Sequence, residues 1–268
     1  MPNYQALSST VHANKHFLRS TTYAFSAMDA VAPLVASELP KAVISLPVGF
    51  LQHDESYIPV AILGVQTGRN LFVAQNGRWA GQYIPSIFRS YPFKLANTED
   101  GQQVLCVDED SGLIIDAEKN TGEALFDAEG KPVQAIMDVL NFLNQSEQSR
   151  LRTVIACAAL QKHNLIRPWS ITLKTETGEQ QIAGLFQIDE AALNQLSGEA
   201  MLEVREAGGL LVAYCQLLSM QHLPVLGELL AAHAKVAAEA LKTPVATSKP
   251  SMGFSLAANT DTINFGNI

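Results

Sequence analysis

The chain has 268 residues, of which 47% are hydrophobic and 16% are charged, a composition typical of a folded protein with a sizeable core. Its formal net charge of −8 argues against nucleic-acid binding, because that function needs a basic surface. Three widely spaced cysteines predict free, buried thiols in a reducing compartment rather than a disulfide framework.

Two features predict a cytoplasmic protein without a membrane span. Residues 1–17 lack a basic segment followed by an apolar one, so no signal peptide is recognisable, although export without a cleaved leader stays open. The longest uninterrupted apolar stretch, around residues 209–218, is shorter than the roughly 20 residues that a membrane-spanning helix needs.

The first half of the chain predicts mainly strands. Residues 1–20 are polar and mixed and predict an arm lying on the surface, whereas 29–39 has a helical apolar pattern that ends at Pro40. Residues 42–50 and 57–65 are rich in β-branched and apolar side chains, which predicts a pair of strands.

Short turns separate the elements that follow. Residues 70–80 predict a hairpin with an Asn-Gly turn, and 83–90 predict a short helix or turn. Residues 104–117 predict a second hairpin-like unit, and 127–130 predict another tight turn.

The second half of the chain is mostly helical in pattern. Apolar residues in 133–158 recur at i, i+3 and i+4, and the polar segment 144–150 either splits this region into two helices or forms an exposed middle. One more hairpin is predicted at 171–188, and Asp189 and Ser197 are expected to be the N-caps of two helices.

Two apolar segments, 210–220 and 223–241, complete this helical half. We expect their apolar stripes, like that of 133–160, to lie mainly in the core, although the small residues of 231–241 could pack tightly on a partner helix. Residues 243–268 contain Pro, Ser, Thr and Asn but few charges, and we expect a flexible tail there.

Together these elements predict an α+β fold. A β-rich part at 23–130, mainly antiparallel because its connections are short, is expected to pack against a mostly helical part at 131–242. We expect residues 1–242 to form one globular domain that precedes the tail at 243–268.

Two polar clusters are candidates for metal sites. His12 and His16 have i, i+4 spacing, but no third ligand is evident, so we expect exposed arm residues. The acidic run at 108–112 does not fit the ligand spacing of an EF-hand loop, and we expect a solvated turn, with ion binding left open. Cys106, which precedes this run, is expected to be a buried strand residue.

The most distinctive cluster combines arginines with aromatic rings. Its members are Arg69, Arg78, Trp79, Tyr83, Arg89, Tyr91 and Phe93. Arg pairs with carboxylate or phosphate and stacks on aromatic rings, so these side chains would form a pocket for an anionic or peptide ligand if they converge. Alternatively, the rings belong to the core and the arginines extend over them at the surface.

Several sequence blocks occur in an order that points to one family. They read TTYAFSAMDAVAPLVASELPKA, SLPVGF, IPVAILG, NLFV, NGRWAGQYIPSIFRSYPF, QVLCVDEDSGLI, ALFDAEGKP, LFQIDEAALNQL and AYCQLLSMQHL. This order resembles the SapC family, bacterial proteins named after a surface-layer accessory, and the resemblance extends to about residue 223. It implies a link to surface-layer biology, and we carry over no catalytic residue, metal or cofactor from it.

Two functions of different classes follow. The first is a non-catalytic accessory protein that binds a polypeptide or protein partner during surface-layer or envelope assembly. The second is an enzyme or small-ligand-binding protein whose Arg- and Tyr-lined pocket lies between the β-rich and helical parts. The expected ligand-binding residues are Arg69, Arg78, Trp79, Tyr83, Arg89 and Asp110.

Overall fold

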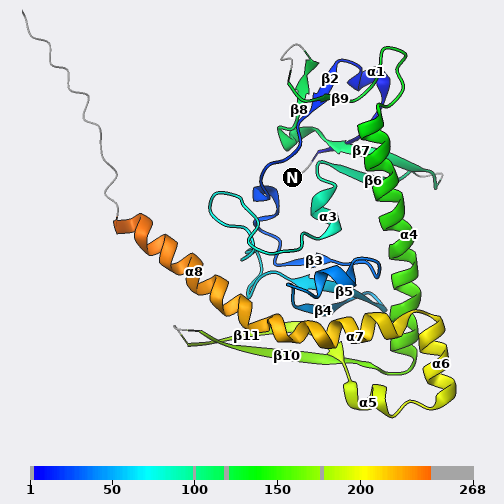
Figure 1. The fold of residues 1–268 in the computed structure, drawn as a ribbon, viewed down its shortest axis with the longest axis vertical. Coiled ribbons are helices and arrows are strands. Elements are labelled where there is room, and N and C mark those ends of the chain that lie inside the picture. Colours follow the sequence, from blue (N-terminus) through cyan, green and yellow to red (C-terminus); the bar gives the residue numbers. More distant parts are fainter. Residues whose placement is uncertain (1–2, 99–100, 118–120, 176–177, 243–268) are drawn as a thin grey trace, which may run out of the picture.

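A five-stranded antiparallel sheet forms the centre of the fold, with the strand order β10–β11–β4–β5–β3 (Figure 1). The computed structural model describes residues 3–98, 101–117, 121–175 and 178–242. The strands of this sheet are β3 Val31–Pro33, β4 Val48–His53, β5 Ser56–Ile62, β10 Ile166–Thr175 and β11 Gly178–Ile188. Phe186 of β11 pairs with Phe50 of β4, so the sheet joins strands from both halves of the sequence.

Two three-stranded sheets lie near the other end of the molecule, in the orders β1–β7–β6 and β8–β2–β9. Their strands are β1 Tyr4–Ala6, β2 Lys15–Phe17, β6 Phe93–Asn97, β7 Gln103–Asp108, β8 Ile114–Asp116 and β9 Glu123–Ala124. The predicted surface arm at residues 1–20 is therefore wrong in part. This segment contributes β1, β2 and the short helix α1 Ser9–His12, because Phe17 and His12 are buried there.

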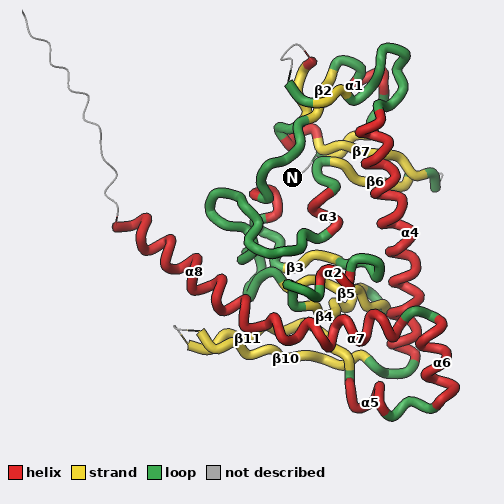
Figure 2. Tube along the Cα trace, in the orientation of Figure 1, coloured by secondary structure: helices red, strands yellow, loops and turns green. Residues whose placement is uncertain are grey.

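The longer helices lie in the second half of the chain, and Figure 2 draws all the helices in red. They are α2 Leu39–Ala42, α3 Ser86–Arg89, α4 Gln134–Lys162, α5 Glu190–Asn194, α6 Gly198–Glu206, α7 Gly209–Ser219 and α8 Leu223–Lys242. Single 3-10 turns occur at Ala24–Ser26, Glu109–Ser111 and Met220–His222. In Figure 1 α4 runs as one rod from the small sheets to the central sheet. The predicted α+β class is confirmed.

The helices α7 and α8 follow each other through one 3-10 turn. By length and composition alone, Gly209–Glu239 could cross a membrane, and 39% of its most apolar window is buried within the protein. The uninterrupted residues 209–218 alone underestimate the length of this apolar segment. His222, Pro224 and Glu228 interrupt the apolar residues, but the helical turns continue through them.

Two clusters of buried apolar side chains hold these layers together. The larger one includes Phe50 and Ile62 of the central sheet, together with Leu160 of α4 and Val212 of α7. The smaller one lies among the small sheets and the start of α4, and contains Phe17, Phe93, Val107, Leu125, Phe126 and Ile136. Burial of these side chains is the main force that joins segments far apart in the sequence.

Several local predictions are confirmed. The strand pair β4–β5 forms at 48–62, and β10 and β11 form the last hairpin. Asp189 accepts a hydrogen bond from the backbone N–H of Ala192, and Ser197 does the same for Ala200, so both are N-caps. These features depend on short-range chemistry that the sequence shows directly.

Other predictions are wrong because long-range pairing prevails over local pattern. The predicted helix at 29–39 contains β3, whose backbone pairs with β5, and only α2 is helical there. The predicted hairpin at 104–117 does not form, because β7 pairs with β1 and β6 while β8 pairs with β2. The polar segment 144–150 does not split the helix, since α4 continues through it. The predicted tail at 243–268 lies outside the described residues.

The expectation that the helical stripes of 133–160 and 210–241 are mainly core is also wrong in part. In the second half of α4 the buried side chains are mostly small, namely Ser149, Thr153, Ala156, Cys157, Ala159 and Leu160. The bulky residues Leu151, Val154 and Ile155 are exposed instead. The side of α4 that carries small residues faces the segment before α2, where Thr153 Oγ1 accepts a hydrogen bond from the backbone N–H of Ala36.

Candidate functional site

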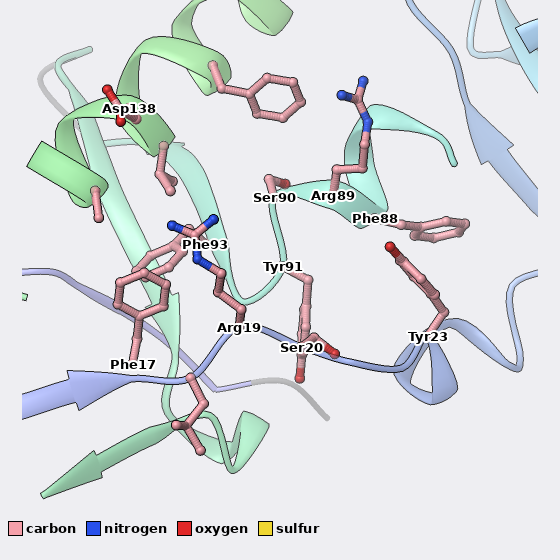
Figure 3. A pocket seen from close by; sticks show the side chains of 14 residues that line it. Phe17, Arg19, Ser20, Tyr23, Phe88, Arg89, Ser90, Tyr91, Phe93 and Asp138 are labelled. Carbon is pink, nitrogen blue, oxygen red and sulfur yellow. The ribbon is translucent and has the colours of Figure 1, made fainter. Parts of the chain in front are cut away.

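A cavity of about 420 Å³ lies where the segment after β2, the α3 region and the first half of α4 meet (Figure 3). It is lined by Phe17, Leu18, Arg19, Ser20, Tyr23, Phe88, Arg89, Ser90, Tyr91, Phe93, Ala135, Asp138, Val139 and Phe142. Ligand sites are typically concave and apolar, with a few polar groups that orient the ligand. The cavity has this character, since six of its fourteen lining residues are aromatic and two are arginines.

The aromatic walls are held by contacts between rings. Phe17 of β2 packs edge-on against Phe93 of β6, with ring centroids 5.4 Å apart. Tyr91 stacks on Phe25 at 3.9 Å, and Phe25 in turn packs edge-on against Phe88 at 6.1 Å. Edge-on and stacked rings contribute beyond their buried area, so these contacts stabilise the wall of the cavity.

Arg89 lies on one side of the cavity at the end of α3. Its guanidinium lies 4.9 Å from the ring centroid of Phe142 and 5.6 Å from that of Tyr83. Nε donates to the carbonyl of Ile84 at 3.1 Å, and Nη2 lies 3.3 Å from the hydroxyl of Tyr83. No carboxylate within the described part of the chain forms an ion pair with Arg89, so its charge is available to a ligand.

A buried carboxylate fixes the backbone and side chains behind Arg89. Glu38 is only 4% exposed, and its Oε2 accepts from the hydroxyl of Tyr83 at 2.7 Å and from the N–H of Ser86 at 2.8 Å. Its Oε1 accepts from the hydroxyl of Ser86 at 2.9 Å and from the N–H of Val35 at 3.0 Å. Burial, followed by the hydrogen bond to Glu38, raises the pKa of Tyr83 well above its usual value. Tyr83 therefore stays a neutral donor, and it positions the guanidinium beside it.

The opposite side of the cavity carries a second arginine and an aspartate. Arg19 extends from the segment after β2 toward Phe17 and Phe93, as Figure 3 shows, and its Nε donates to Glu123 at 2.6 Å. Asp138 lies on the first half of α4 and accepts from the amide of Gln134 at 2.8 Å. The cavity is thus lined by Arg89, a cation unpaired among the described residues, by Arg19 in its ion pair with Glu123, and by the carboxylate of Asp138.

Tyr91 joins the cavity wall to the acidic turn after β7. Its hydroxyl donates to Asp108 Oδ2 at 3.3 Å, and Asp108 Oδ1 accepts from the N–H of Asn3 at 2.8 Å. Burial, followed by the charge of Asp108, raises the pKa of Tyr91 to about 12. The hydroxyl is therefore protonated at neutral pH and serves as a structural donor.

The predicted ligand-binding residues divide into two groups. Arg89 lines the cavity, and Tyr83 lies directly behind it. Trp79 also lies behind the cavity wall, where its Nε1 donates to the carbonyl of Tyr83 and its ring packs against the cavity residue Phe88. Of the other rings in the cluster, Tyr91 also lines the cavity, and so does Phe93.

The remaining predicted residues do not line this cavity. Arg78 is exposed and ends a tight turn that begins at Ala74, where the backbone N–H of Ala74 donates to the carbonyl of Arg78 at 2.9 Å. Arg69 is partly exposed in the loop after β5, and Asp110 is exposed in the 3-10 turn after β7. Of the six expected ligand-binding residues, Arg89 alone lines this cavity.

Several cavity residues were missed at the level of sequence. Arg19 and Phe17 belong to the segment expected to be a surface arm, so no site was expected there. Asp138 and Phe142 lie one helical turn apart on α4, on the same side as Ala135 and Val139. The i, i+3, i+4, i+7 spacing of these four residues was the available signal, and it was obscured by the stronger apolar stripe beside it.

The residues weighed as metal ligands have other partners. His12 is fully buried rather than exposed, and its Nε2 lies 2.6 Å from Glu109 Oε1, while Nδ1 lies 3.1 Å from the carbonyl of Ser8. His16 instead lies 3.1 Å from the carbonyl of Thr121. Across the described ranges no three His, Cys, Asp or Glu side chains are grouped for a metal ion. Within the acidic run, Asp108 is buried and hydrogen-bonded, so the predicted solvated turn is wrong at this residue.

The fold and the cavity together define a class of protein, an α+β protein with an aromatic, arginine-containing pocket beside a long helix. A family model described as SapC matches residues 7–226, and the chain belongs to the SapC family. Searches of the curated proteins and of the solved structures return no match.

Proposed function

We propose that this protein is a polypeptide-binding accessory protein whose cavity between α3 and α4 accepts an acidic side chain or a terminal carboxylate of its partner. The observation that carries the proposal is the exposed guanidinium of Arg89, held between Tyr83 and Phe142 at the edge of an aromatic cavity. A carboxylate that pairs with this guanidinium would place its apolar neighbours against the rings.

The size and charge of the cavity support a side chain rather than a large cofactor. A volume of about 420 Å³ is near the lower end of the range for ligand pockets, roughly 300–1,000 Å³. Asp138 lies apart from Arg89 on α4 and would favour a donor or cation on the ligand. A peptide segment that carries an acidic group beside an apolar side chain meets these requirements.

The biological setting is proposed from the family. Membership of the SapC family supports a role in surface-layer or envelope assembly, with an envelope polypeptide as the partner. We propose that the protein acts in the cytoplasm, because Cys106, Cys157 and Cys215 are all free and free thiols are typical of a reducing compartment.

A panel of peptides tests the proposal. The purified wild-type chain is used to select from a random phage-displayed peptide library, and the enriched peptides are synthesised and titrated by fluorescence anisotropy. We expect them to share Asp or Glu, or a free C-terminus, beside an apolar residue. Loss of a charge-assisted hydrogen bond costs about 1.5–3 kcal/mol, so Arg89→Gln should weaken binding by roughly 10- to 100-fold.

A matched control separates the cavity from general charge. Arg78→Gln removes the same charge from an exposed turn that does not line the cavity, and it should bind the peptides like the wild type. The proposal fails if no peptide is enriched, or if Arg89→Gln binds the enriched peptides as tightly as Arg78→Gln does.

The contact between Arg89 and Tyr83 also favours a second candidate, the binding of a small anionic ligand in the same cavity. Native mass spectrometry of the protein purified from its own host tests this directly. A retained adduct that is lost in Arg89→Gln, together with failure of the peptide selection, would replace the polypeptide proposal with this one.

A further inference from the structure

Two neighbouring helices turn bulky apolar side chains toward solvent. On α4, Leu151 and Ile155 are 52% and 59% exposed, and they lie one helical turn apart. On α7, Leu211, Tyr214 and Leu218 are 47%, 48% and 62% exposed and recur at i, i+3 and i+7. We refer to these five residues as the α4–α7 face.

The exposure of this face is not a consequence of loose packing. The opposite sides of both helices are well buried, with Ala156 and Cys157 on α4 and Val212 and Ala213 on α7 at 1% exposure or less. At the crossing of the two helices, a Cβ on Gly209 would lie 3.3 Å from the carbonyl oxygen of Ala156. The helices are therefore seated closely through small residues, while several large apolar residues beside this contact point outward.

The two exposed rows meet at one hollow. A cavity of about 420 Å³ is lined by Ile155 of α4 and Leu211 of α7, and also by the charged residues Arg152 and Glu206. Arg152 and Glu206 do not form an ion pair with each other, and no other described residue forms one with either. One unpaired cation and one unpaired anion thus flank the place where the rows join.

We propose that the α4–α7 face is the interface of a two-fold symmetric dimer of this chain, in which Arg152 of each copy pairs with Glu206 of the other. In a two-fold interface each patch contacts an identical patch, so it must complement itself. A patch with one free cation and one free anion satisfies this condition when the two-fold axis passes between them, because the rotation then brings each charge to its opposite. Closed two-fold dimers are also the commonest oligomers.

The area of the face suits the same occupant. Five side chains of this size, each about half exposed, present on the order of 500 Å² of surface, which is near the upper end of what a monomer leaves uncovered. With the flanking charged residues, the face approaches the roughly 800 Å² that each partner buries in a standard interface.

A lipid surface fits the face less well. Binding to anionic membranes draws on clusters of Lys and Arg, whereas α7 contains neither residue and the whole chain has a net charge of −8. At the junction of the two rows the charges of Arg152 and Glu206 offset each other, so the site offers no net positive charge to anionic headgroups. The charges at this site therefore favour a second copy.

The first test is the mass of the full chain in solution. Light scattering coupled to size exclusion should give a dimer that dissociates on dilution from about 100 μM to below about 1 μM. Leu218→Glu, at the most exposed position of the face, should weaken the dimer at least tenfold. Met28→Glu is the matched control, since Met28 is 70% exposed in the segment before β3, and it should dimerise like the wild type.

The second test uses charge exchange, which a general loss of stability cannot imitate. Arg152→Glu alone places two anions opposite each other at both ends of the interface, and Glu206→Arg alone places two cations there, so each variant should dimerise at least tenfold more weakly. An equimolar mixture of the two variants restores both pairs, and it should form a heterodimer within about threefold of the wild-type affinity.

Three results would overturn the proposal. The first is a wild-type chain that stays monomeric at about 100 μM. The second is a mixture of charge variants that associates no better than either variant alone. The third is a wild-type monomer that sediments with phosphatidylcholine vesicles, which would assign the face to a lipid surface instead.

Discussion

Replacing the buried carboxylate of Glu38 by an amide should destabilise the protein although the change is nearly isosteric. The carboxylate accepts four hydrogen bonds, two of them from the backbone N–H groups of Val35 and Ser86. These two N–H groups donate to different oxygens, so in Glu38→Gln one of them must face an NH₂ group in either orientation of the amide. That N–H is left without an acceptor in a site that is 4% exposed.

The magnitude follows from the lost bonds. A hydrogen bond to a charged group contributes about 1.5–3 kcal/mol, and a buried unpaired N–H costs a similar amount. Removing the buried charge recovers part of its desolvation cost, so we expect the free energy of unfolding to fall by about 2 kcal/mol in Glu38→Gln. Tyr83→Phe removes one donor and leaves the other three, and it should cost about 1.5 kcal/mol.

Urea unfolding followed by circular dichroism measures this change as a lower midpoint at constant slope. Glu55→Gln, an exposed carboxylate in the β4–β5 turn, is the control and should leave the midpoint unchanged. If Glu38→Gln unfolds within about 0.5 kcal/mol of the wild type, the carboxylate does not hold the backbone behind Arg89 as described.

Three further outcomes are expected. Gly64→Ala should destabilise the fold by about 3 kcal/mol or more, because a Cβ would collide with the carbonyl oxygen of Arg69. A Cβ at Gly198 would meet no atom within 4 Å, so Gly198→Ala should raise stability by up to about 1 kcal/mol. Thermal melts distinguish the two variants. Burial raises the pKa of the Cys157 thiol to about 12, so mass mapping of the product with a thiol reagent should find this residue modified only after unfolding, and modification of Cys157 in the native chain would contradict its burial. The pKa of Tyr91 is raised to about 12 in the folded chain, so the unfolded chain releases this proton first as pH rises through about 10. The contribution of Tyr91 to the free energy of unfolding is therefore present below pH 10 and is lost toward pH 12. In urea titrations, the free energy of unfolding of Tyr91→Phe should decline less over that window than that of the wild type.

The parts of the fold that the sequence predicted are those decided by neighbouring residues. The β4–β5 pair, the β10–β11 hairpin and the N-caps Asp189 and Ser197 all depend on interactions within a few residues. The parts that were missed depend on more distant partners: β3 pairs with β5 across about thirty residues, and β2 pairs with β8 and β9 across about a hundred. Thus Phe17 pairs with Ile114 and Glu123, and no pattern within residues 1–20 indicates either partner.

The candidate site shows the same division. The sequence pattern at residues 69–93 predicts that Tyr83 and Arg89 lie together because they are close in sequence, and Arg89 Nη2 does contact the hydroxyl of Tyr83. Arg19 and Phe142 complete the cavity from segments far from that cluster on either side. Only the burial of the small-sheet core, which places β2 beside the start of α4, brings these residues together.

The long helix α4 explains why an apolar stripe was assigned to the core and found partly at the surface. Its periodicity reports that one side is apolar, but it does not say whether this chain or another copy covers that side. The two proposals lie along the same helix: Phe142 at the cavity and Ile155 on the α4–α7 face are 13 residues apart, or about 20 Å along the axis at 1.5 Å per residue. Because the helix carries the two sites on separate turns, Leu218→Glu should leave peptide binding unchanged, and Arg89→Gln should leave the dimer unchanged. Loss of both properties in either variant would mean that the face and the cavity form one binding surface rather than two.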